Sequence, residues 1–248
     1  MRDLFAGLLD LWLPPACAAC GEPTEHALCA RCTAALPRIP AGRCALCQER
    51  PAAPGRGDRC AACARRRGPL LACVAGCWYE GDAAAWIRAY KYARRRGLSA
   101  DDRLRVCALA GETLARAPAE PPDQVVPVPL HRRRLRARGF NPALAVARHL
   151  ARARGVPLRP RALARCRDTP SQTGLSRSGR RRNVRGAFRA PAPVPARVWL
   201  VDDVVTTGAT LAEAARVLRR AGAKQVVALC AARTPAPGPS PRGRSSPR

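Results

Sequence analysis

Residues 197–210 read RVWLVDDVVTTGAT: an apolar run, then Asp202 and Asp203, then hydroxyl-bearing residues around Gly208. A run that is apolar at every position predicts a strand buried on both faces, as in a parallel sheet. Two adjacent carboxylates repel each other unless a cation or hydroxyl groups lie between them. The stretch therefore predicts a buried strand that ends at a ligand site.

Apolar strands and helical segments alternate from about residue 70. The helix expected at 141–155 has the clearest signals, since Asn141 suits its N-cap, Pro142 its first turn and Gly155 its C-terminal end. The alternation predicts an α/β fold with a parallel sheet flanked by helices, in which ligands bind beyond the carboxyl ends of the strands. An arginine-rich stretch at 171–188 is expected to form a polar loop. The expected strands are 70–79, 124–130, 197–203 and 224–232, and the expected helices are 82–92, 101–117, 141–155 and 210–223.

The segment after the acidic pair joins the strand to a helix N-terminus, where free backbone N–H groups and the helix dipole favour an anion. It lacks the lysine of a Walker loop. Carboxylates bind phosphate poorly but accept hydrogen bonds from vicinal ribose hydroxyls, so a sugar phosphate satisfies both halves of the stretch. We therefore expect Asp202 and Asp203 to hold a ribose. The expected phosphate-binding residues are Val205, Thr206, Thr207, Gly208, Ala209 and Thr210.

Eight of the thirteen cysteines form four Cys-x2-Cys pairs near the start of the chain. Two such pairs supply the four sulfurs of a tetrahedral zinc site, so four pairs predict two structural zinc ions. Sequential pairing would give a double zinc ribbon, and an interleaved arrangement is the alternative. The expected ligands are Cys17, Cys20, Cys29, Cys32, Cys44, Cys47, Cys60 and Cys63.

The net charge is +28, from 45 Lys and Arg residues against 17 Asp and Glu, and the lysines are Lys91 and Lys224 alone. A GC-rich genome and an anionic partner both explain such a composition. Residues 131–190 contain eighteen arginines and one acid, Asp168, which favours the anionic partner there. The first residues predict a short amphipathic helix, and no segment predicts a membrane span. Clustered cysteines and the absence of a leader pattern indicate a cytoplasmic protein.

Several blocks together resemble the ComF family of competence-associated proteins, whose main domain is similar to type I phosphoribosyltransferases. They are the double Cys-x2-Cys head after LLDLWLPPAC, IRAYKYARRRGLS, VPVPLHRRRLRARGFN, DTPSQTGLSRSGRRRNVRGAF and the opening stretch. One departure is Pro142, where the family usually has glutamine. The resemblance implies binding of phosphoribosyl diphosphate with Mg²⁺. It implies a diphosphate loop after the second strand, and the expected diphosphate-binding residues are Lys91, Pro129, Leu130, His131, Arg132 and Arg138.

The expected organisation is an amphipathic helix and double zinc ribbon over residues 1–67, a phosphoribosyltransferase-like domain over 68–233 and a disordered basic tail over 234–248. One functional hypothesis is an enzyme that transfers phosphoribosyl groups and releases diphosphate, in DNA uptake and natural transformation. The other is a non-catalytic competence factor that binds single-stranded DNA and competence-machinery proteins and keeps the pocket for binding or regulation. Ten aromatic residues in the whole chain offer few stacking platforms for nucleobases.

Overall fold

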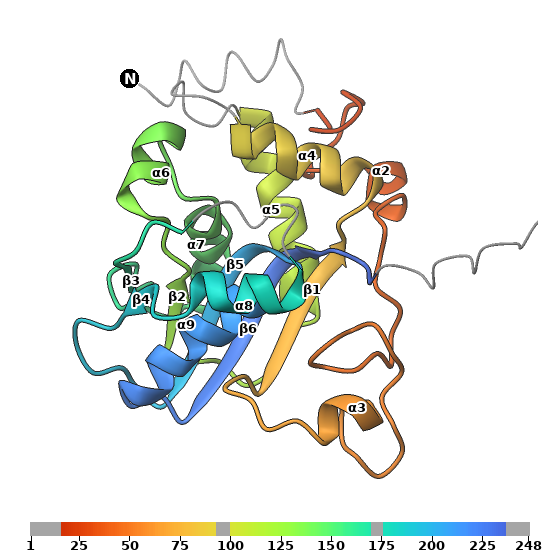
Figure 1. The fold of residues 1–248 in the computed structure, drawn as a ribbon. Helices are drawn as coiled ribbons and strands as arrows, with labels where there is room; N and C mark the ends of the chain where they lie inside the picture. Colours follow the sequence, from red (N-terminus) through yellow and green to blue (C-terminus); the bar gives the residue numbers. More distant parts are fainter. Residues whose placement is uncertain (1–15, 93–99, 170–175, 237–248) are drawn as a thin grey trace, which may run out of the picture.

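A four-stranded parallel sheet forms the centre of the protein. The computed structural model describes residues 16–92, 100–169 and 176–236. The strand order is β1-β6-β5-β2, and all neighbouring strands run parallel (Figure 1). The strands are β1 (Ala72–Trp78), β2 (Gln124–Pro127), β5 (Arg197–Val205) and β6 (Gln225–Arg233). The predicted α/β fold with a parallel sheet is confirmed.

Helices cover both faces of this sheet (Figure 1). On one face α5 (Ala100–Ala115) packs on β1 and β6, and α7 (Pro142–Arg154) packs on β5 and β2. On the other face α9 (Ala209–Arg220) packs on β5 and β6. One apolar core lies between the sheet and helices α5 and α7 and contains Leu229. A second lies between the sheet and α9 and contains Leu200, and both leucine side chains are fully buried. This explains why the strands are apolar at successive positions.

The predicted caps of α7 are all present. The Asn141 side chain accepts a hydrogen bond from the Ala143 backbone N–H at 3.2 Å, and Pro142 is the first helical residue. Gly155 ends the helix with φ at 64°, a left-handed conformation that favours glycine. Helix α4 (Gly81–Tyr92) packs against α5 and includes Asp82 in its first turn.

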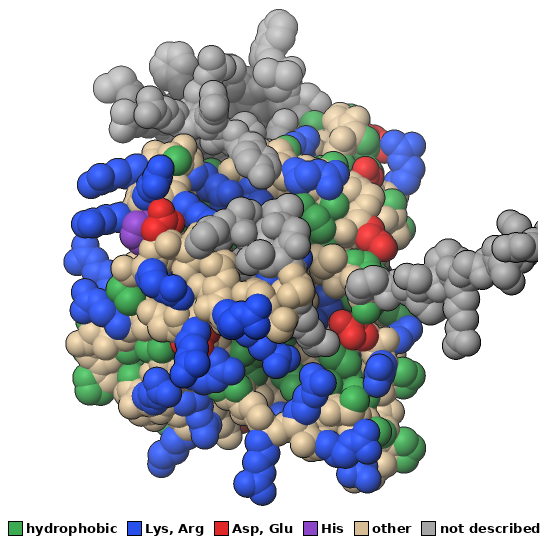
Figure 2. Space-filling view, viewed as in Figure 1, with side chains coloured by type: hydrophobic (Ala, Val, Ile, Leu, Met, Phe, Trp, Pro, Cys, Tyr) green, Lys and Arg blue, Asp and Glu red, His purple; other side chains and the backbone are tan. Residues whose placement is uncertain are grey.

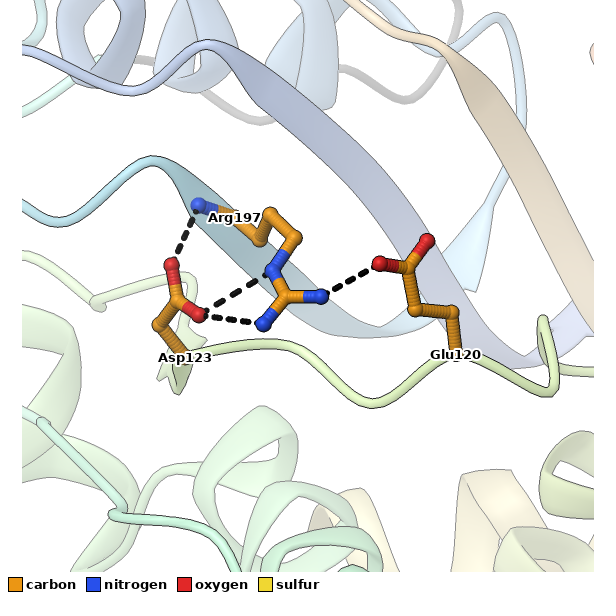
Figure 3. Close-up of polar contacts among 3 residues, drawn as sticks. All are labelled: Glu120, Asp123 and Arg197. Carbon is orange, nitrogen blue, oxygen red and sulfur yellow. Dashed lines mark hydrogen bonds and ion pairs between the residues drawn. The ribbon is translucent and has the colours of Figure 1, made fainter.

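An ion-pair group sets the register of β2 against β5 (Figure 3). The Arg197 guanidinium donates to Asp123 Oδ1 at 2.9 Å and also pairs with Glu120. The Arg197 backbone N–H donates to Asp123 Oδ2 at 2.9 Å. These backbone and side-chain hydrogen bonds lower the pKa of Asp123. In this register Pro127, the last residue of β2, lies opposite Val201, the residue before the acidic pair.

The two arginine-rich segments form helices. The basic stretch after β2 is α6 (Arg132–Arg138), and the segment expected to be a loop contains α8 (Arg177–Val184). The loop prediction was wrong because Ser176 caps α8 by accepting from the Gly179 N–H at 3.1 Å, and because α8 packs against α9. A small antiparallel pair, β3 (Ala164–Arg165) with β4 (Phe188–Arg189), was not predicted.

The cysteine-rich head lies across the free edge of β1. Its two short helices are α2 (Ala30–Ala34) and α3 (Ala61–Ala64). Between these helices the chain runs along β1. The Trp78 N–H donates to the Pro37 carbonyl at 2.7 Å, and Arg38 forms an isolated antiparallel β-bridge with Cys77. Such a cover protects an edge strand from pairing with another chain.

The expected N-terminal helix and most of the expected tail lie outside the described residues. Within the described part, no helix is both long and apolar enough to cross a bilayer.

Candidate phosphoribosyl site

The acidic pair lies near the carboxyl end of β5, as predicted. Asp202 Oδ1 accepts from the Asp203 N–H at 2.9 Å, and Asp203 Oδ1 accepts from the Val204 N–H at 2.6 Å. Burial, and then the negative charge of Asp203, raise the pKa of Asp202 well above its usual range. A pair of this kind is stabilised by any cation that binds beside it.

Helix α4 brings Lys91 to the acidic pair. Its Nζ lies 3.0 Å from Asp203 Oδ2, and the lysine side chain is about 20% exposed. The two residues come from distant parts of the chain, so this contact is formed only by the fold. The structure thus brings Lys91 to the acidic pair, and its contact with a diphosphate stays a prediction.

Tyr90 is a residue of the site that the sequence did not single out. Its side chain is 2% exposed, and its hydroxyl has no hydrogen-bond partner among the described residues. Burial, and then the charges of Asp203 and Asp202, raise its pKa, while the charge of Arg138 acts in the opposite direction. The charges of the acidic pair and of the predicted Arg138 therefore act on this hydroxyl. Its position next to Lys91 was a signal in the sequence, but neighbouring residues of a helix point in different directions.

The threonine loop, residues 205–210, follows the acidic pair directly. Gly208 precedes α9 with φ at 73°, a conformation that allows a tight turn from strand to helix. The Thr207 hydroxyl is buried and has no partner in the described part of the chain. Free N–H groups at the start of a helix together with an unpaired hydroxyl suit a phosphate group.

The turn after β2 lies beside the acidic pair. The Val128 N–H donates to the Val201 carbonyl at 2.8 Å, so Pro129 and Leu130 follow next to the end of β5. His131 caps α6, and its Nδ1 lies 3.5 Å from Asp168 Oδ1. Arg132 is exposed. Pro129 and Leu130, two of the predicted diphosphate residues, therefore border the same end of the sheet.

The eight predicted metal ligands form two groups. Within each group all four sulfurs lie within 4.8 Å of one another. The Sγ atoms of Cys20 and Cys29 are 3.8 Å apart, and so are those of Cys47 and Cys60. The first group joins the first two pairs and the second group joins the last two, so the pairing is sequential rather than interleaved. The members of the first cluster are Cys17, Cys20, Cys29 and Cys32, and those of the second cluster are Cys44, Cys47, Cys60 and Cys63.

Comparison with known proteins decides the family. Residues 137–243 match the phosphoribosyl transferase domain family. The DNA utilization protein YhgH of Salmonella typhimurium is 33% identical over 225 residues, which cover 88% of this chain and 90% of that protein. The chain belongs to the ComF/YhgH family. The match to the domain family includes the acidic pair and the threonine loop but neither Lys91 nor the cysteine clusters.

Other relatives match over a shorter stretch. The YhgH protein of Escherichia coli O157:H7 is 44% identical over 114 residues, which cover 46% of this chain and 50% of that protein. Competence protein F of Haemophilus influenzae is 37% identical over 109 residues, which cover 42% of this chain and 48% of that protein. The matched part of this ComF/YhgH chain thus spans about half the length of these two relatives.

Two solved structures align with part of the chain. Glutamine phosphoribosylpyrophosphate amidotransferase from B. subtilis aligns over 58% of this chain and 30% of its own, with 25% identity and a TM-score of 0.40. A purine phosphoribosyltransferase from Pyrococcus horikoshii aligns over 58% of this chain and 82% of its own, with 22% identity and a TM-score of 0.30.

Proposed function

We propose that this protein binds phosphoribosyl diphosphate at the carboxyl end of β5 and transfers its phosphoribosyl group. The observation that carries the proposal is the convergence of three parts of the chain: the acidic pair with its threonine loop, Lys91 from α4 and the turn after β2. Asp202 and Asp203 accept hydrogen bonds from the ribose hydroxyls, and the threonine loop binds the 5-phosphate. Lys91 and the residues after β2 face the diphosphate.

In the proposed reaction the bond between the anomeric carbon and the diphosphate oxygen breaks, and its electron pair leaves with the diphosphate. The acceptor forms a new bond to the same carbon and gives its proton to solvent. The chain contributes by holding the ribose and by placing cations near the leaving group, which stabilises the charge that develops there.

Metal ions fit both parts of the protein. Four sulfurs about 2.3 Å from one tetrahedral zinc ion lie about 3.8 Å apart, which is the separation found in both clusters. We therefore propose one structural Zn²⁺ in each cluster. The paired carboxylates of Asp202 and Asp203 are hard oxygen donors of the kind that Mg²⁺ prefers, so the site suits a magnesium complex of the diphosphate substrate.

Calorimetry with phosphoribosyl diphosphate and Mg²⁺ tests the proposal. We expect one binding site in the wild-type protein and loss of binding in the Asp202→Asn/Asp203→Asn variant. Glu120→Gln is the matched control, because it removes a carboxylate at the opposite end of β5. Release of diphosphate with a panel of nucleobases then tests transfer. Absence of binding by the wild-type protein would contradict the proposed function.

A second function, binding of single-stranded DNA, is favoured by the charge and by the names of the relatives. Figure 2 shows Lys and Arg side chains spread over the face that carries α8 and α9, and the net charge is +28. We expect the logarithm of the association constant to fall linearly with the logarithm of the salt concentration, by roughly 0.7 for each phosphate neutralised. An absence of binding at low salt would contradict this second function.

A further inference from the structure

A cavity of about 200 Å³ lies between the second cluster and the threonine loop. Its volume is far above the roughly 10–15 Å³ that one water molecule needs. Cys47 and Cys63 line it on one side, and Thr206, Thr207 and Gly208 line it on the other. The cavity therefore connects a predicted metal centre with the proposed phosphate site.

The charge around the cavity is strongly positive. Arg66 and Arg67 follow the last cysteine of the second cluster, and Arg181 comes from α8. All three are exposed, and in the described part of the chain no carboxylate lies within ion-pair distance of any of them. Glu49 is the one acidic residue among those that line the cavity. Three unpaired guanidinium groups around one cavity favour an anionic ligand.

A fourth arginine lines the cavity from inside the protein. Arg233 is 4% exposed, and its guanidinium donates to Gln48 Oε1 at 3.1 Å and to the Cys73 carbonyl at 3.0 Å. It also donates to the Cys73 thiol at 3.1 Å, and no carboxylate pairs with Arg233 among the described residues. A buried charge that no carboxylate compensates is costly, so an anion in the cavity would stabilise it. The buried, unpaired hydroxyl of Thr207 offers a further donor.

Hydrogen bonds fix the second cluster to the sheet. Arg66 and Arg67, which follow its last cysteine, therefore have a defined position. The Cys73 N–H donates to the Ala45 carbonyl at 2.7 Å. The Gln48 amide donates to the Ala75 carbonyl at 3.2 Å and accepts from the Ala75 N–H at 2.8 Å. In the register of the sheet, Ala75 of β1 pairs with Cys230 of β6, and Cys230 pairs with Asp202 of β5. A single row across the sheet thus links the second cluster to the acidic pair.

We propose that the second cluster is part of the phosphate site: Arg66, Arg67 and Arg181 bind the 5-phosphate of the ligand from the cavity, opposite the threonine loop. This inference rests on the proposed function and extends it to a phosphate monoester as the group recognised. It gives the second cluster a role in ligand binding that the first cluster lacks.

Calorimetry with ribose 5-phosphate, and separately with phosphoribosyl diphosphate and Mg²⁺, tests the inference. We expect the dissociation constant of both ligands to rise about tenfold or more for each arginine removed in Arg66→Ala/Arg67→Ala and in Arg181→Ala. Arg50→Ala/Arg65→Ala and Arg182→Ala are the matched controls, because they remove the same charge from exposed neighbours that do not line the cavity. We expect these controls to bind within about twofold of the wild type.

The two proposals fail in different ways. If wild-type protein binds neither ligand, the proposed function is wrong. If wild-type protein binds phosphoribosyl diphosphate but the Arg66→Ala/Arg67→Ala variant binds as well as its control does, the proposed function stands and this inference is overturned. Cys63→Ser against Cys32→Ser gives an independent comparison, with loss of ribose 5-phosphate binding expected only for the first.

Discussion

The two cysteine clusters are built alike and are placed differently. In the first, the Gly21 N–H donates to the Cys17 carbonyl at 2.8 Å, and in the second the Gln48 N–H donates to the Cys44 carbonyl at the same distance. In each, the third cysteine precedes a short helix. Yet the first cluster packs into the core on the α5 face, where Arg105 donates to the Ala18 carbonyl at 2.6 Å, and the second packs on the α9 face beside the cavity.

The residue after the second cysteine shows what this difference means. Gly21 has φ at 77° and nothing within 4 Å of where a Cβ would lie. Gln48 has φ at 55°, which is unfavourable for any residue with a side chain. Its side chain is 5% exposed and is held by Ala75 and Arg233. The same turn therefore serves only local geometry in the first cluster, and fixes the head to the sheet in the second.

Metal removal gives the largest expected effect. Metal analysis should find about two zinc ions per chain, and Cys17→Ser and Cys44→Ser should each leave about one. Apparent binding free energies of structural zinc are about 10–16 kcal/mol, so a strong chelator should unfold the head. One ion in the wild-type protein, or a disulfide-bonded head, would contradict the assignment of both clusters.

Gln48→Ala should give the next largest effect. It keeps the left-handed backbone but removes the hydrogen bonds to Ala75 and Arg233, which should lower the free energy of unfolding by about 3 kcal/mol. Urea denaturation measures this. Gln48→Gly removes the same bonds but relieves the backbone, so it should be about 1 kcal/mol more stable than Gln48→Ala. A neutral Gln48→Ala variant would show that the side chain does not fix the second cluster.

Asp202→Asn tests whether the ionised Asp202 carboxylate destabilises the folded protein. The raised pKa of Asp202 means that the folded protein binds more protons than the unfolded chain once the pH exceeds about 4, the usual value. The free energy of unfolding should therefore fall as the pH rises from there through the folded pKa. Asp202→Asn should remove this loss and stabilise the ligand-free protein at neutral pH. Urea denaturation between pH 4 and 8 checks it, and a variant less stable than wild type at pH 7 would contradict the expectation.

Gly21→Ala should give the smallest effect. The new methyl group meets no neighbour, so the cost is the left-handed backbone alone, about 1 kcal/mol. Thermal unfolding and ribose 5-phosphate binding should be measured together, with binding unchanged. A loss of ligand binding in this variant would mean that the first cluster also serves the site, and the comparison between the two clusters would fail.

Local patterns predicted most of the fold. The apolar runs of β5 and β6 and the caps of α7 follow from residue types over a few positions, and the structure confirms them. The paired Cys-x2-Cys spacing likewise predicted the ligand groups. Helix α8 was missed because much of its support comes from α9, which lies beyond its own sequence.

The candidate site was predicted only in part, because several of its contacts join distant segments. The acidic pair and the threonine loop are one continuous stretch, so their proximity was certain from the sequence. The place of Arg66 beside that loop depends on how the head docks on β1, and that of Arg181 depends on the packing of α8 against α9. No spacing in the sequence reveals either. The unpaired hydroxyl of Tyr90 depends in the same way on the packing of α4.

A crystal structure of the protein with phosphoribosyl diphosphate and Mg²⁺ tests the central claim most directly. The account predicts ribose hydroxyls within hydrogen-bond distance of Asp202 and Asp203, and the 5-phosphate between the threonine loop and Arg66, Arg67 and Arg181. Ligand bound elsewhere, or a 5-phosphate that contacts neither the threonine loop nor these arginines, would contradict it.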